Sequence, residues 1–254
     1  MTTPATTSSG RPTTAVETSG VRVVNGHRLS VTAHEGVGDV VVIFCHGFVS
    51  NSTGPQRAFV RAARRLGEFG VASLRFDQYG SGNSAGEYEE SSFIDWCATT
   101  TALVDAELER GRRVVLFGQS MGASAAIVVA SRRPELAGLV AWVPDPNTDP
   151  LDVGADDLLE EAGQLVRGRY WQEAREADVA GCLSRVACPA YLVQCTEDAL
   201  VDEANRRAIA VAARDHHVVD TWDGLPHSAW SHQQSTEIIE RSVTFVRALP
   251  HGAR

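Results

Sequence analysis

The sequence predicts an α/β protein with a mainly parallel eight-stranded sheet and helices on both faces of that sheet. Three observations support this prediction. Several short runs are almost entirely apolar, which is typical of strands that are covered on both sides. Helical patterns lie between these runs, so strand and helix alternate along the chain. The 254 residues are 43% hydrophobic and 22% charged, which is the composition of an ordinary globular domain.

The chain begins with a segment that we expect to be a disordered leader, residues 1–18. This segment is rich in Thr, Ser and Pro and contains no apolar stretch that could form the core of a signal peptide. Residues 19–254 are expected to form a single domain that opens with a hairpin. Its strands, Val21 to Val24 and Leu29 to His34, flank Asn25-Gly26, the dipeptide best suited to the positive φ angles of a tight turn.

Six further strands and five helices are expected after the hairpin. The strands are Val40 to Cys45, Ala72 to Phe76, Val114 to Phe117, Leu139 to Val143, Tyr191 to Cys195 and His216 to Trp222. The helices are Gln56 to Leu66, Ser92 to Glu109, Ser120 to Ser131, Glu203 to Ala213 and about Ser235 to Leu249. Because helices connect successive strands, most of these strands are expected to be parallel.

The alternation of strand and helix lapses between Pro144 and Pro189. We expect an insert at about 145–188, with one or two amphipathic helices between Ala155 and Ala177. Long inserts in compact domains are usually functional, so a short helical lid insert is the preferred interpretation. A longer crossover connection is the alternative.

Charge and cysteine content argue against several classes of function. The chain has 23 basic and 32 acidic residues, a net charge of −9, and no basic patch in the sequence, so binding to nucleic acid is not expected. The five cysteines are widely spaced and include no Cys-x-x-Cys pair, which argues against a disulfide framework and against a metal site. No apolar run approaches the roughly 20 residues of a membrane-spanning helix. We therefore expect a cytoplasmic protein, either a monomer or a homodimer.

A Gly-x-Ser-x-Gly motif directly follows the predicted strand Val114 to Phe117. It consists of Gly118-Gln119-Ser120-Met121-Gly122 and precedes a helix of small residues. A serine at a sharp turn between a strand and a helix takes a strained backbone conformation that exposes its hydroxyl. The two glycines fit this turn, because the strand and the helix approach too closely for a β-carbon. We therefore expect Ser120 to be a catalytic nucleophile.

A serine nucleophile needs a base and an acid, and both are expected after Ser120 in the chain. For the base, His227 is preferred to His232, because it lies in the turn between the last predicted strand and the final helix. For the acid, Asp198 at the end of the penultimate strand is preferred, and Asp145 at the end of the strand before it is the alternative. In this scheme His227 takes the proton of Ser120 and Asp198 orients the imidazole. Water then hydrolyses the acyl-enzyme.

Two backbone N–H groups are candidates for stabilising the oxyanion that forms when Ser120 attacks a carbonyl. His46-Gly47-Phe48 ends the strand Val40 to Cys45, where the chain leaves the sheet. The N–H of Phe48 and the N–H of Met121 are expected to face the developing charge together. His46 is expected to brace the loop and not to act as a base.

These motifs resemble those of the α/β-hydrolase family. Besides the serine motif, the resemblance rests on His46-Gly47-Phe48 and on Asp77-Gln78-Tyr79-Gly80-Ser81-Gly82-Asn83-Ser84, which is similar to the family's Asp-x-x-Gly-x-Gly-x-Ser loop. The continuation Ala85-Gly86-Glu87-Tyr88 is similar to cinnamoyl or feruloyl esterases and to serine-aminopeptidase and monoacylglycerol-lipase-like hydrolases. The resemblance covers about Val21 to Leu249. It implies the α/β-hydrolase fold and hydrolysis of carboxylic esters without a metal or an organic cofactor.

The first hypothesis for the function is a carboxylesterase that acts on a small or medium-sized ester. Five aromatic residues near predicted loops and the insert are candidates for an apolar substrate pocket, with ordinary packing as the alternative: Tyr79, Trp142, Tyr170, Trp171 and Trp230. A second hypothesis keeps the same three catalytic residues in an acyltransferase or a thioesterase. A third hypothesis is a catalytically idle scaffold that binds a ligand. In each case the expected partner is a small molecule.

Overall fold

The computed structural model describes residues 16–146 and 152–250. The strands, in chain order, are β1 (Glu17–Val24), β2 (His27–His34), β3 (Val40–Cys45), β4 (Ala72–Phe76), β5 (Arg113–Gln119), β6 (Gly138–Trp142), β7 (Leu158–Glu161), β8 (Gln164–Arg167), β9 (Ala190–Cys195) and β10 (His217–Trp222). The α-helices are α1 (Ala58–Glu68), α2 (Phe93–Glu109), α3 (Met121–Ala130), α4 (Gly168–Glu176), α5 (Val179–Leu183), α6 (Glu203–Ala212) and α7 (His232–Ala248). Two short 3₁₀ helices are η1 (Pro55–Arg57) and η2 (Tyr88–Glu90).

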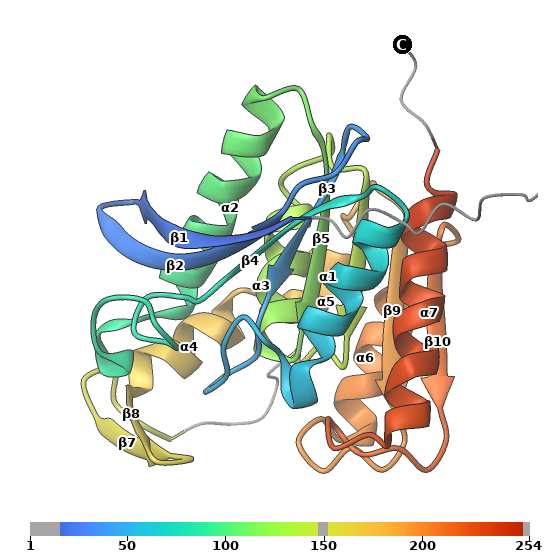
Figure 1. The fold of residues 1–254 in the computed structure, drawn as a ribbon. Helices are drawn as coiled ribbons and strands as arrows, with labels where there is room; N and C mark the ends of the chain where they lie inside the picture. The colour runs from blue at the N-terminus through green and yellow to red at the C-terminus, as the bar shows by residue number, and fades with distance from the viewer. Residues whose placement is uncertain (1–15, 147–151, 251–254) are drawn as a thin grey trace, which may run out of the picture.

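Eight of these strands form one sheet, in the order β1-β2-β4-β3-β5-β6-β9-β10 (Figure 1). β2 is antiparallel to both of its neighbours, β1 and β4, whereas the other neighbouring pairs are parallel. The predicted eight-stranded, mainly parallel sheet is therefore confirmed. The central strands β3, β5 and β6 end at one edge of the sheet, so the loops that follow them meet there.

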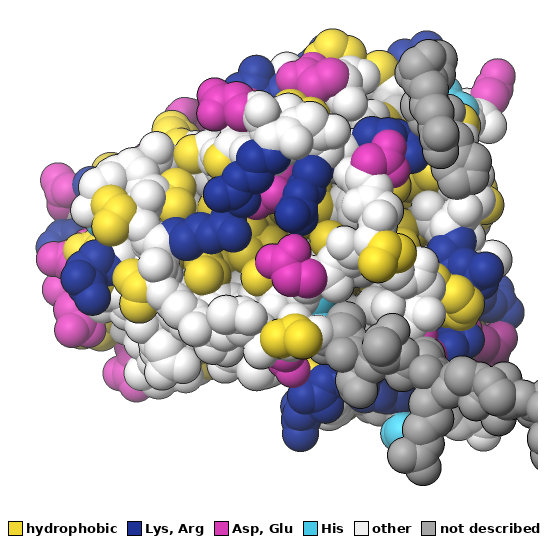
Figure 2. Space-filling model, turned by 45° about the horizontal axis from the view of Figure 1, so that its top comes forward, with side chains coloured by type: hydrophobic (Ala, Val, Ile, Leu, Met, Phe, Trp, Pro, Cys, Tyr) yellow, Lys and Arg dark blue, Asp and Glu magenta, His cyan; other side chains and the backbone are white. Residues whose placement is uncertain are grey.

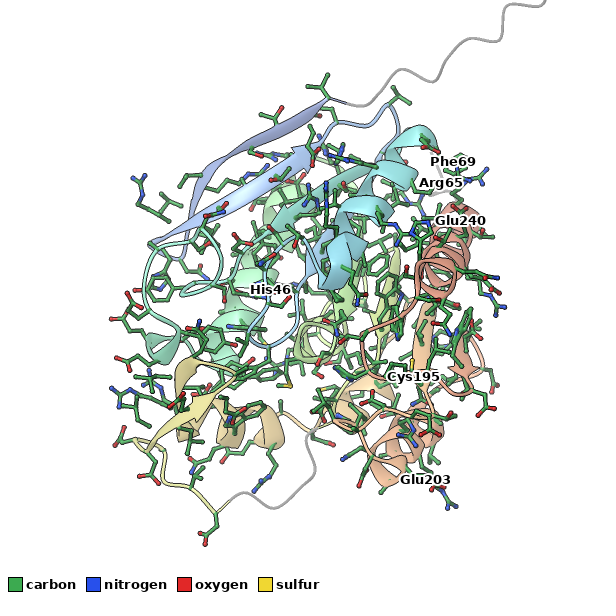
Figure 3. All side chains as sticks on the ribbon, turned by 60° about the horizontal axis from the view of Figure 1, so that its bottom comes forward. His46, Arg65, Phe69, Cys195, Glu203 and Glu240 are labelled. Carbon is green, nitrogen blue, oxygen red and sulfur yellow. The ribbon has the colours of Figure 1, made fainter. Side chains whose placement is uncertain are left out.

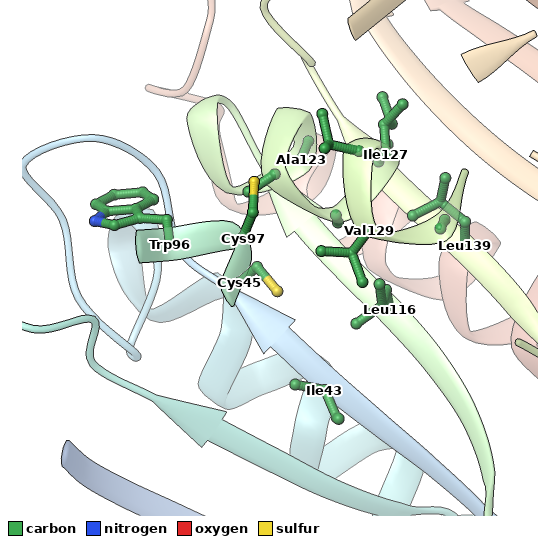
Figure 4. Close-up of a cluster of buried hydrophobic side chains, with 14 of the residues drawn as sticks. Ile43, Cys45, Trp96, Cys97, Leu116, Ala123, Ile127, Val129 and Leu139 are labelled. Carbon is green, nitrogen blue, oxygen red and sulfur yellow. The ribbon is translucent and has the colours of Figure 1, made fainter. Parts of the chain in front are cut away.

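Helices cover both faces of the sheet, and the side chains of β3 show how. Val41 and Ile43 belong to a buried apolar cluster that includes residues of α2, α3, α5 and α6, part of which is drawn in Figure 4. Val42 and Phe44 belong to a second cluster, which includes residues of α1 and α7. Burial of one such side chain contributes roughly 2 kcal/mol. Because alternate residues enter different clusters, the strand must be apolar at every position, as the sequence is.

Helices α1 and α7 lie side by side on the second face of the sheet. Arg65 of α1 forms an ion pair with Glu240 of α7 at 2.8 Å and lies over the ring of Phe69, as Figure 3 shows. The pair is partly exposed, and such pairs contribute roughly 0–1 kcal/mol. The apolar contacts beneath it therefore account for most of the stability of this helix pair.

The hairpin at the start of the domain has the predicted turn. Asn25 and Gly26 have φ angles of 50° and 84°, as a two-residue turn of this kind requires. Strand β1 begins at Glu17, so it starts inside the predicted leader of residues 1–18. The carboxylate of Glu17 is paired with Arg64 at 3.1 Å and with Arg75, which ties this strand to the body. Residues 1–15 of the predicted leader lie outside the described residues.

The insert differs from the prediction in its first half. Residues 158–167 form the hairpin β7–β8, and only then does helix α4 begin. The expected helix from Ala155 is therefore wrong over this stretch. The turn of the hairpin is formed by Ala162 and Gly163 with φ angles of 48° and 80°. Alanine rarely takes a positive φ, so the sequence contains no strong signal for this turn.

The surface mixes charges of both signs. The chain contains no lysine, so all 23 basic residues are arginines. Figure 2 shows arginine side chains among Asp and Glu side chains on the face that it presents, with no separate basic field there. Within residues 16–146 and 152–250, no helix combines the length and the apolar character needed to cross a membrane.

Candidate active site

Ser120 occupies a strained turn between β5 and α3. Its φ and ψ angles are 53° and −128°, a conformation that side-chain-bearing residues rarely adopt. The Ser120 N–H donates to the carbonyl of Trp142 at 2.9 Å, and its own carbonyl accepts from Ala123 and Ser124 at 2.8 and 3.0 Å. These hydrogen bonds hold the strained residue in place, as strained functional residues require.

The two glycines of the motif are needed because backbone segments meet at this turn. A β-carbon on Gly122 would lie closer than 3.0 Å to the carbonyl oxygens of Cys45 and His46. A β-carbon on Gly118 would lie as close to the backbone of Ala123. Strand β3, strand β5 and helix α3 can therefore approach each other only with glycine at these positions.

The side chains of Ser120, His227 and Asp198 form a continuous hydrogen-bonded chain. The Ser120 hydroxyl lies 2.9 Å from Nε2 of His227, and Nδ1 of His227 lies 2.6 Å from Oδ2 of Asp198. With Nδ1–H donating to the carboxylate, Nε2 is left to accept the serine proton. His227 and Asp198 are buried, with 8% and 6% exposed surface, so the hydrogen bond between them is shielded from bulk water.

Asp198 is held by the start of its own loop. Its Oδ1 accepts from the N–H groups of Leu200 and Val201, both at 2.9 Å. Burial alone would raise the pKa of Asp198, but the hydrogen bonds from His227 and from these two N–H groups outweigh it, so its pKa lies below the ordinary value. The carboxylate is therefore ionised and fixed in orientation at neutral pH.

The alternatives for the acid and the base lie elsewhere. The main chain of Asp145 is tied to the Ser124 hydroxyl, which donates to its carbonyl at 2.6 Å and accepts from its N–H at 3.1 Å. His232 begins helix α7, and its carbonyl accepts from Thr236. The structure brings Asp198 to His227 and gives His227, not His232, the contact with the serine.

The loop that carries Phe48 lies against the serine turn. A β-carbon on Gly47 would be 3.2 Å from the β-carbon of Ser120, so the backbone here passes directly beside the serine. Met121 is the first residue of α3, and the first N–H groups of a helix have no acceptor within the helix. Both predicted oxyanion donors, the N–H groups of Phe48 and Met121, are therefore carried by segments next to Ser120.

His46 braces this loop from beneath (Figure 3). It is fully buried, its Nδ1–H donates to the carbonyl of Gly47 at 2.8 Å, and its Nε2 accepts from the N–H of Gln78 at 3.0 Å. Burial lowers the pKa of His46, which keeps the ring neutral. These contacts support the structural role expected for this histidine.

The loop that begins at Asp77 also supports the site from behind. One oxygen of the Asp77 carboxylate accepts from the N–H of Ser52 at 2.6 Å, and the other accepts from the N–H of Asn83 at 2.9 Å. The Ser84 hydroxyl donates to the carbonyl of Asp77 at 2.6 Å. The motif thus closes its own loop and fixes the segment after Phe48, as a structural motif should.

A cleft of about 340 Å³ opens beside Ser120 and His227. It is lined by Gly47, Phe48, Val49, Ser50, Pro55, Gln119, Ser120, Glu161, Ala162, Leu200, His227 and Ser228. A larger apolar cavity, of about 570 Å³, lies between α2, α3 and α4, but Ser120 and His227 do not line it. The smaller cleft is therefore the candidate active site, because it contains the hydrogen-bonded chain.

Two of the three tryptophans predicted for the pocket, Trp142 and Trp230, are core residues. Trp142 is completely buried, and its indole N–H donates to the hydroxyl of Ser242 at 3.0 Å. Trp230 packs on Trp142 with ring centroids 5.5 Å apart, and its indole N–H donates to the carbonyl of Pro226. Large aromatic side chains stabilise a core by their area, and this use has prevailed here over pocket lining.

The other three aromatic candidates also lie outside the lining of the cleft. Tyr170 is completely buried beneath Phe48, with ring centroids 5.2 Å apart. Trp171 packs on the ring of Phe48 at 4.6 Å, behind the cleft wall. Tyr79 donates its hydroxyl to Glu90 at 2.8 Å on the surface. None of the five aromatic residues predicted for the pocket is therefore among the residues that line this cleft.

Glu161 and Leu200 are among the residues of the cleft that were not predicted from the sequence. Glu161 reaches the cleft because the hairpin β7–β8 carries it there, and that hairpin was not predicted. Burial raises the pKa of Glu161 above its ordinary value, although a hydrogen bond from Trp171 acts in the opposite direction. Leu200 lines the cleft and is 69% exposed, so it offers an apolar surface to a ligand.

Comparisons with known proteins agree with this fold. A family model described as serine aminopeptidase, S33, matches residues 38–150. A search of curated proteins found no match. Among solved structures, the chain is similar to Est1E from Butyrivibrio proteoclasticus with ferulic acid bound, with a TM-score of 0.80 and 22% identity over 91% of this chain and 98% of that chain.

Two further structures show the same likeness. The esterase domain of a Rhodothermus marinus protein has a TM-score of 0.71 and 20% identity, over 92% of this chain and 99% of that chain. Alpha/beta hydrolase domain-containing protein 10 from mouse has a TM-score of 0.72 and 18% identity, over 91% and 98% respectively. With its sheet order, its serine turn and these similarities, the chain has the α/β-hydrolase fold.

Proposed function

We propose that the protein is a serine hydrolase that cleaves a carboxylic ester through an acyl-enzyme. The observation that carries this proposal is the hydrogen-bonded chain from Ser120 through His227 to Asp198, placed at a strained turn beside a cleft. A serine hydroxyl is a weak nucleophile unless an adjacent base accepts its proton. The three residues supply a nucleophile, a base and an orienting acid at hydrogen-bond distances.

In the first half of the reaction, Oγ of Ser120 attacks the ester carbonyl carbon while its proton moves to Nε2 of His227. The carbonyl oxygen becomes negatively charged, and the N–H groups of Phe48 and Met121 are proposed to stabilise that charge. Asp198 stabilises the imidazolium through Nδ1–H. The tetrahedral intermediate then collapses, the C–O bond to the leaving group breaks, and the imidazolium gives its proton to the departing alcohol.

In the second half, water replaces the alcohol. Nε2 of His227 takes a proton from the water while the oxygen of that water attacks the carbonyl carbon of the acyl-enzyme. The second tetrahedral intermediate collapses, Ser120 leaves and regains its proton from His227, and the carboxylic acid is released. The same residues thus act twice, and no other co-reactant is consumed.

Ester substrates are supported by the similar structures, which include Est1E and an esterase domain. We propose further that the insert at about 145–188 covers the cleft. Its support is that Glu161 and Ala162 of the hairpin line the cleft together with the serine and the histidine. The five cysteines, all buried and unpaired, support action in a reducing compartment such as the cytoplasm.

The test is intact-mass detection of a covalent adduct after treatment with a fluorophosphonate probe, together with turnover of p-nitrophenyl esters of increasing chain length. We expect one adduct on the wild type and none on Ser120→Ala. His227→Ala should lose nearly all turnover while keeping its thermal melting profile, because the base acts in chemistry and not in folding.

An adduct that persists in Ser120→Ala, or full turnover by His227→Ala, would contradict the proposal. No adduct and no turnover in the wild type would favour an idle scaffold. If the wild type does turn over esters, the dependence of turnover on chain length would indicate the size of the acyl pocket.

A further inference from the structure

Phe48 is held on several sides by aromatic rings from distant parts of the chain. Its ring packs on Trp171 at 4.6 Å and on Tyr170 at 5.2 Å, both from the insert. Tyr88 of η2 contacts it edge-on, with centroids 5.2 Å apart and an interplanar angle of 87°. Aromatic pairs in such geometries contribute about 0.5–1.5 kcal/mol each beyond their buried area. The side chain of Phe48 is therefore fixed against both η2 and the insert.

The residue after Phe48 is strained. Val49 has a φ angle of 49°, and a β-branched residue in the left-handed region is a genuine outlier. Its N–H donates to the hydroxyl oxygen of Tyr88 at 3.1 Å. This hydrogen bond fixes the peptide plane that joins Phe48 to Val49, so it helps to hold the strained turn.

Tyr88 is itself rigidly placed. Only 4% of its surface is exposed, and its ring packs on Trp96 at 6.4 Å. Trp96 also packs on His46, the histidine that braces the same loop, at 5.2 Å. Burial raises the pKa of Tyr88, so its hydroxyl stays neutral. The loop from His46 to Val49 is thus fixed at its start by a histidine and at its end by a tyrosine.

We propose that Tyr88 is a positioning residue. Its hydroxyl holds the Val49 peptide and thereby orients the Phe48 N–H toward the oxyanion. Trp171 of the insert assists by packing on the ring of Phe48. The inference rests on the proposed function, because it concerns the oxyanion donor of that reaction. It gives the Ala85-Gly86-Glu87-Tyr88 segment a role and links the insert to the chemistry. Charge on the carbonyl oxygen develops only in the transition state, so a loosened donor lowers kcat more than it changes KM.

The test uses Tyr88→Phe, which keeps the ring and removes the acceptor of the Val49 N–H. We expect kcat to fall on the order of 10-fold, less than the loss on removing an oxyanion donor outright, with KM little changed. Binding of a trifluoromethyl ketone, which forms a tetrahedral adduct with the serine, should weaken by the same factor as kcat/KM, because both depend on the oxyanion donors.

Tyr191→Phe is the matched control. It removes another largely buried tyrosine hydroxyl, one that donates to Asp220 between β9 and β10, away from the lining of the cleft. We expect wild-type kcat and ketone affinity from this variant. Trp171→Leu tests the packing of the insert on Phe48 and is the second variant if Tyr88→Phe folds poorly. It should also lower kcat while changing KM little.

The outcomes separate the positioning role from the proposed function. Wild-type kcat and ketone affinity in both Tyr88→Phe and Trp171→Leu, with a serine adduct and turnover in the wild type, would overturn the positioning role alone. A fall in kcat without a matching loss of ketone affinity would also overturn it. A wild type that forms no serine adduct and turns over no ester would overturn the proposed function and this inference with it.

Discussion

At the scale of single residues, His227 is the centre of the site, because it contacts two side chains that are distant in the chain. Nε2 lies 2.9 Å from Ser120 and Nδ1 lies 2.6 Å from Asp198. Each ring nitrogen therefore has one partner, which fixes both the tautomer and the orientation of the ring. The proposed chemistry depends on this fixed orientation more than on any single contact elsewhere.

The acid can be tested by comparing two aspartates. We expect Asp198→Asn to lower kcat by a factor on the order of 10³ to 10⁴, because the amide cannot hold the imidazole in the tautomer that the reaction needs. Asp145→Asn should cost much less, since it is Asp198 whose carboxylate lies 2.6 Å from Nδ1 of His227. Steady-state kinetics on one ester would decide the matter. The reverse order of effects would assign the acid to Asp145.

Glu161 gives the cleft a charge that depends on pH. Above its pKa the carboxylate repels an anionic acyl group, so Glu161→Gln should raise kcat/KM several-fold for an ester with a sulfonate on its acyl group. A neutral sulfonamide counterpart should be little affected.

The effect of Glu161 should also depend on pH. As pH falls through the raised pKa of Glu161, the carboxylate takes up a proton, and kcat/KM of the wild type for the sulfonate ester should approach that of the variant. The ratio of kcat/KM for the two esters, measured as pH is lowered, checks this. An unchanged ratio in the variant would show that Glu161 does not face the acyl group.

At the scale of elements, the site is built where backbone segments meet. The end of β3, the end of β5 and the start of α3 approach within van der Waals distance, and Gly118 and Gly122 permit it. The hydroxyl of Ser120 is exposed by this crossing and not by any special property of the serine itself. Close packing of the backbone therefore determines where the Ser120 hydroxyl points.

A methyl group at Gly122 tests this crossing. Gly122→Ala would place a carbon closer than 3.0 Å to two backbone carbonyls, so we expect a loss of roughly 1–3 kcal/mol in stability and a fall in kcat as the loop of Phe48 moves. Gly20→Ala, with nothing within 4 Å of the added carbon, is the control. Thermal melting and kcat measured on both variants would show the difference. A Gly122→Ala protein as stable and active as the control would contradict the account of the turn.

The elements that carry the site differ in how well they could be predicted from the sequence. The contact between Ser120 and His227 was predictable because each residue lies in a turn of known type after a recognisable strand. Asp198 was preferred as the partner of His227, but Asp145 stayed open as the alternative, since both follow strands that end at the same edge of the sheet. Only the path of the loop separates them. The hairpin with Ala162 at its turn was missed because alanine carries no signal for a positive φ.

At the scale of the whole molecule, the apolar runs in the sequence predicted where strands lie along the chain, but not which strands pair with each other in the sheet. A run such as β4 is buried on both faces wherever it lies in the sheet, so hydrophobicity does not say that it pairs with β2 and β3. The order of the strands was therefore not predicted and is known from the structure. The five aromatic residues predicted for the pocket do not line the cleft for a related reason. Aromatic character alone does not distinguish a core residue such as Trp142 from one that lines a cleft.

The reactivity of the five cysteines depends on whether the whole protein is folded, because all five are buried. Burial raises the pKa of Cys45, Cys97 and Cys195 to about 12 and that of Cys188 to about 11, and Cys182 is buried as well. We therefore expect iodoacetamide to label none of the five thiols in the native protein and all five in denaturant, as read by intact mass. Rapid labelling of any one thiol in the native protein would show local opening at that position.

The order of the elements along the chain also sets when the site can exist. Ser120 and the loop of Phe48 lie in the first half of the chain, whereas Asp198 and His227 follow β9 and β10, the last strands of the sheet. A polypeptide emerging from the ribosome therefore carries Ser120 long before it carries His227. Under the proposed mechanism, hydrolysis therefore requires nearly complete synthesis of the chain, and a molecule truncated before residue 227 would be inactive however well its first half folds.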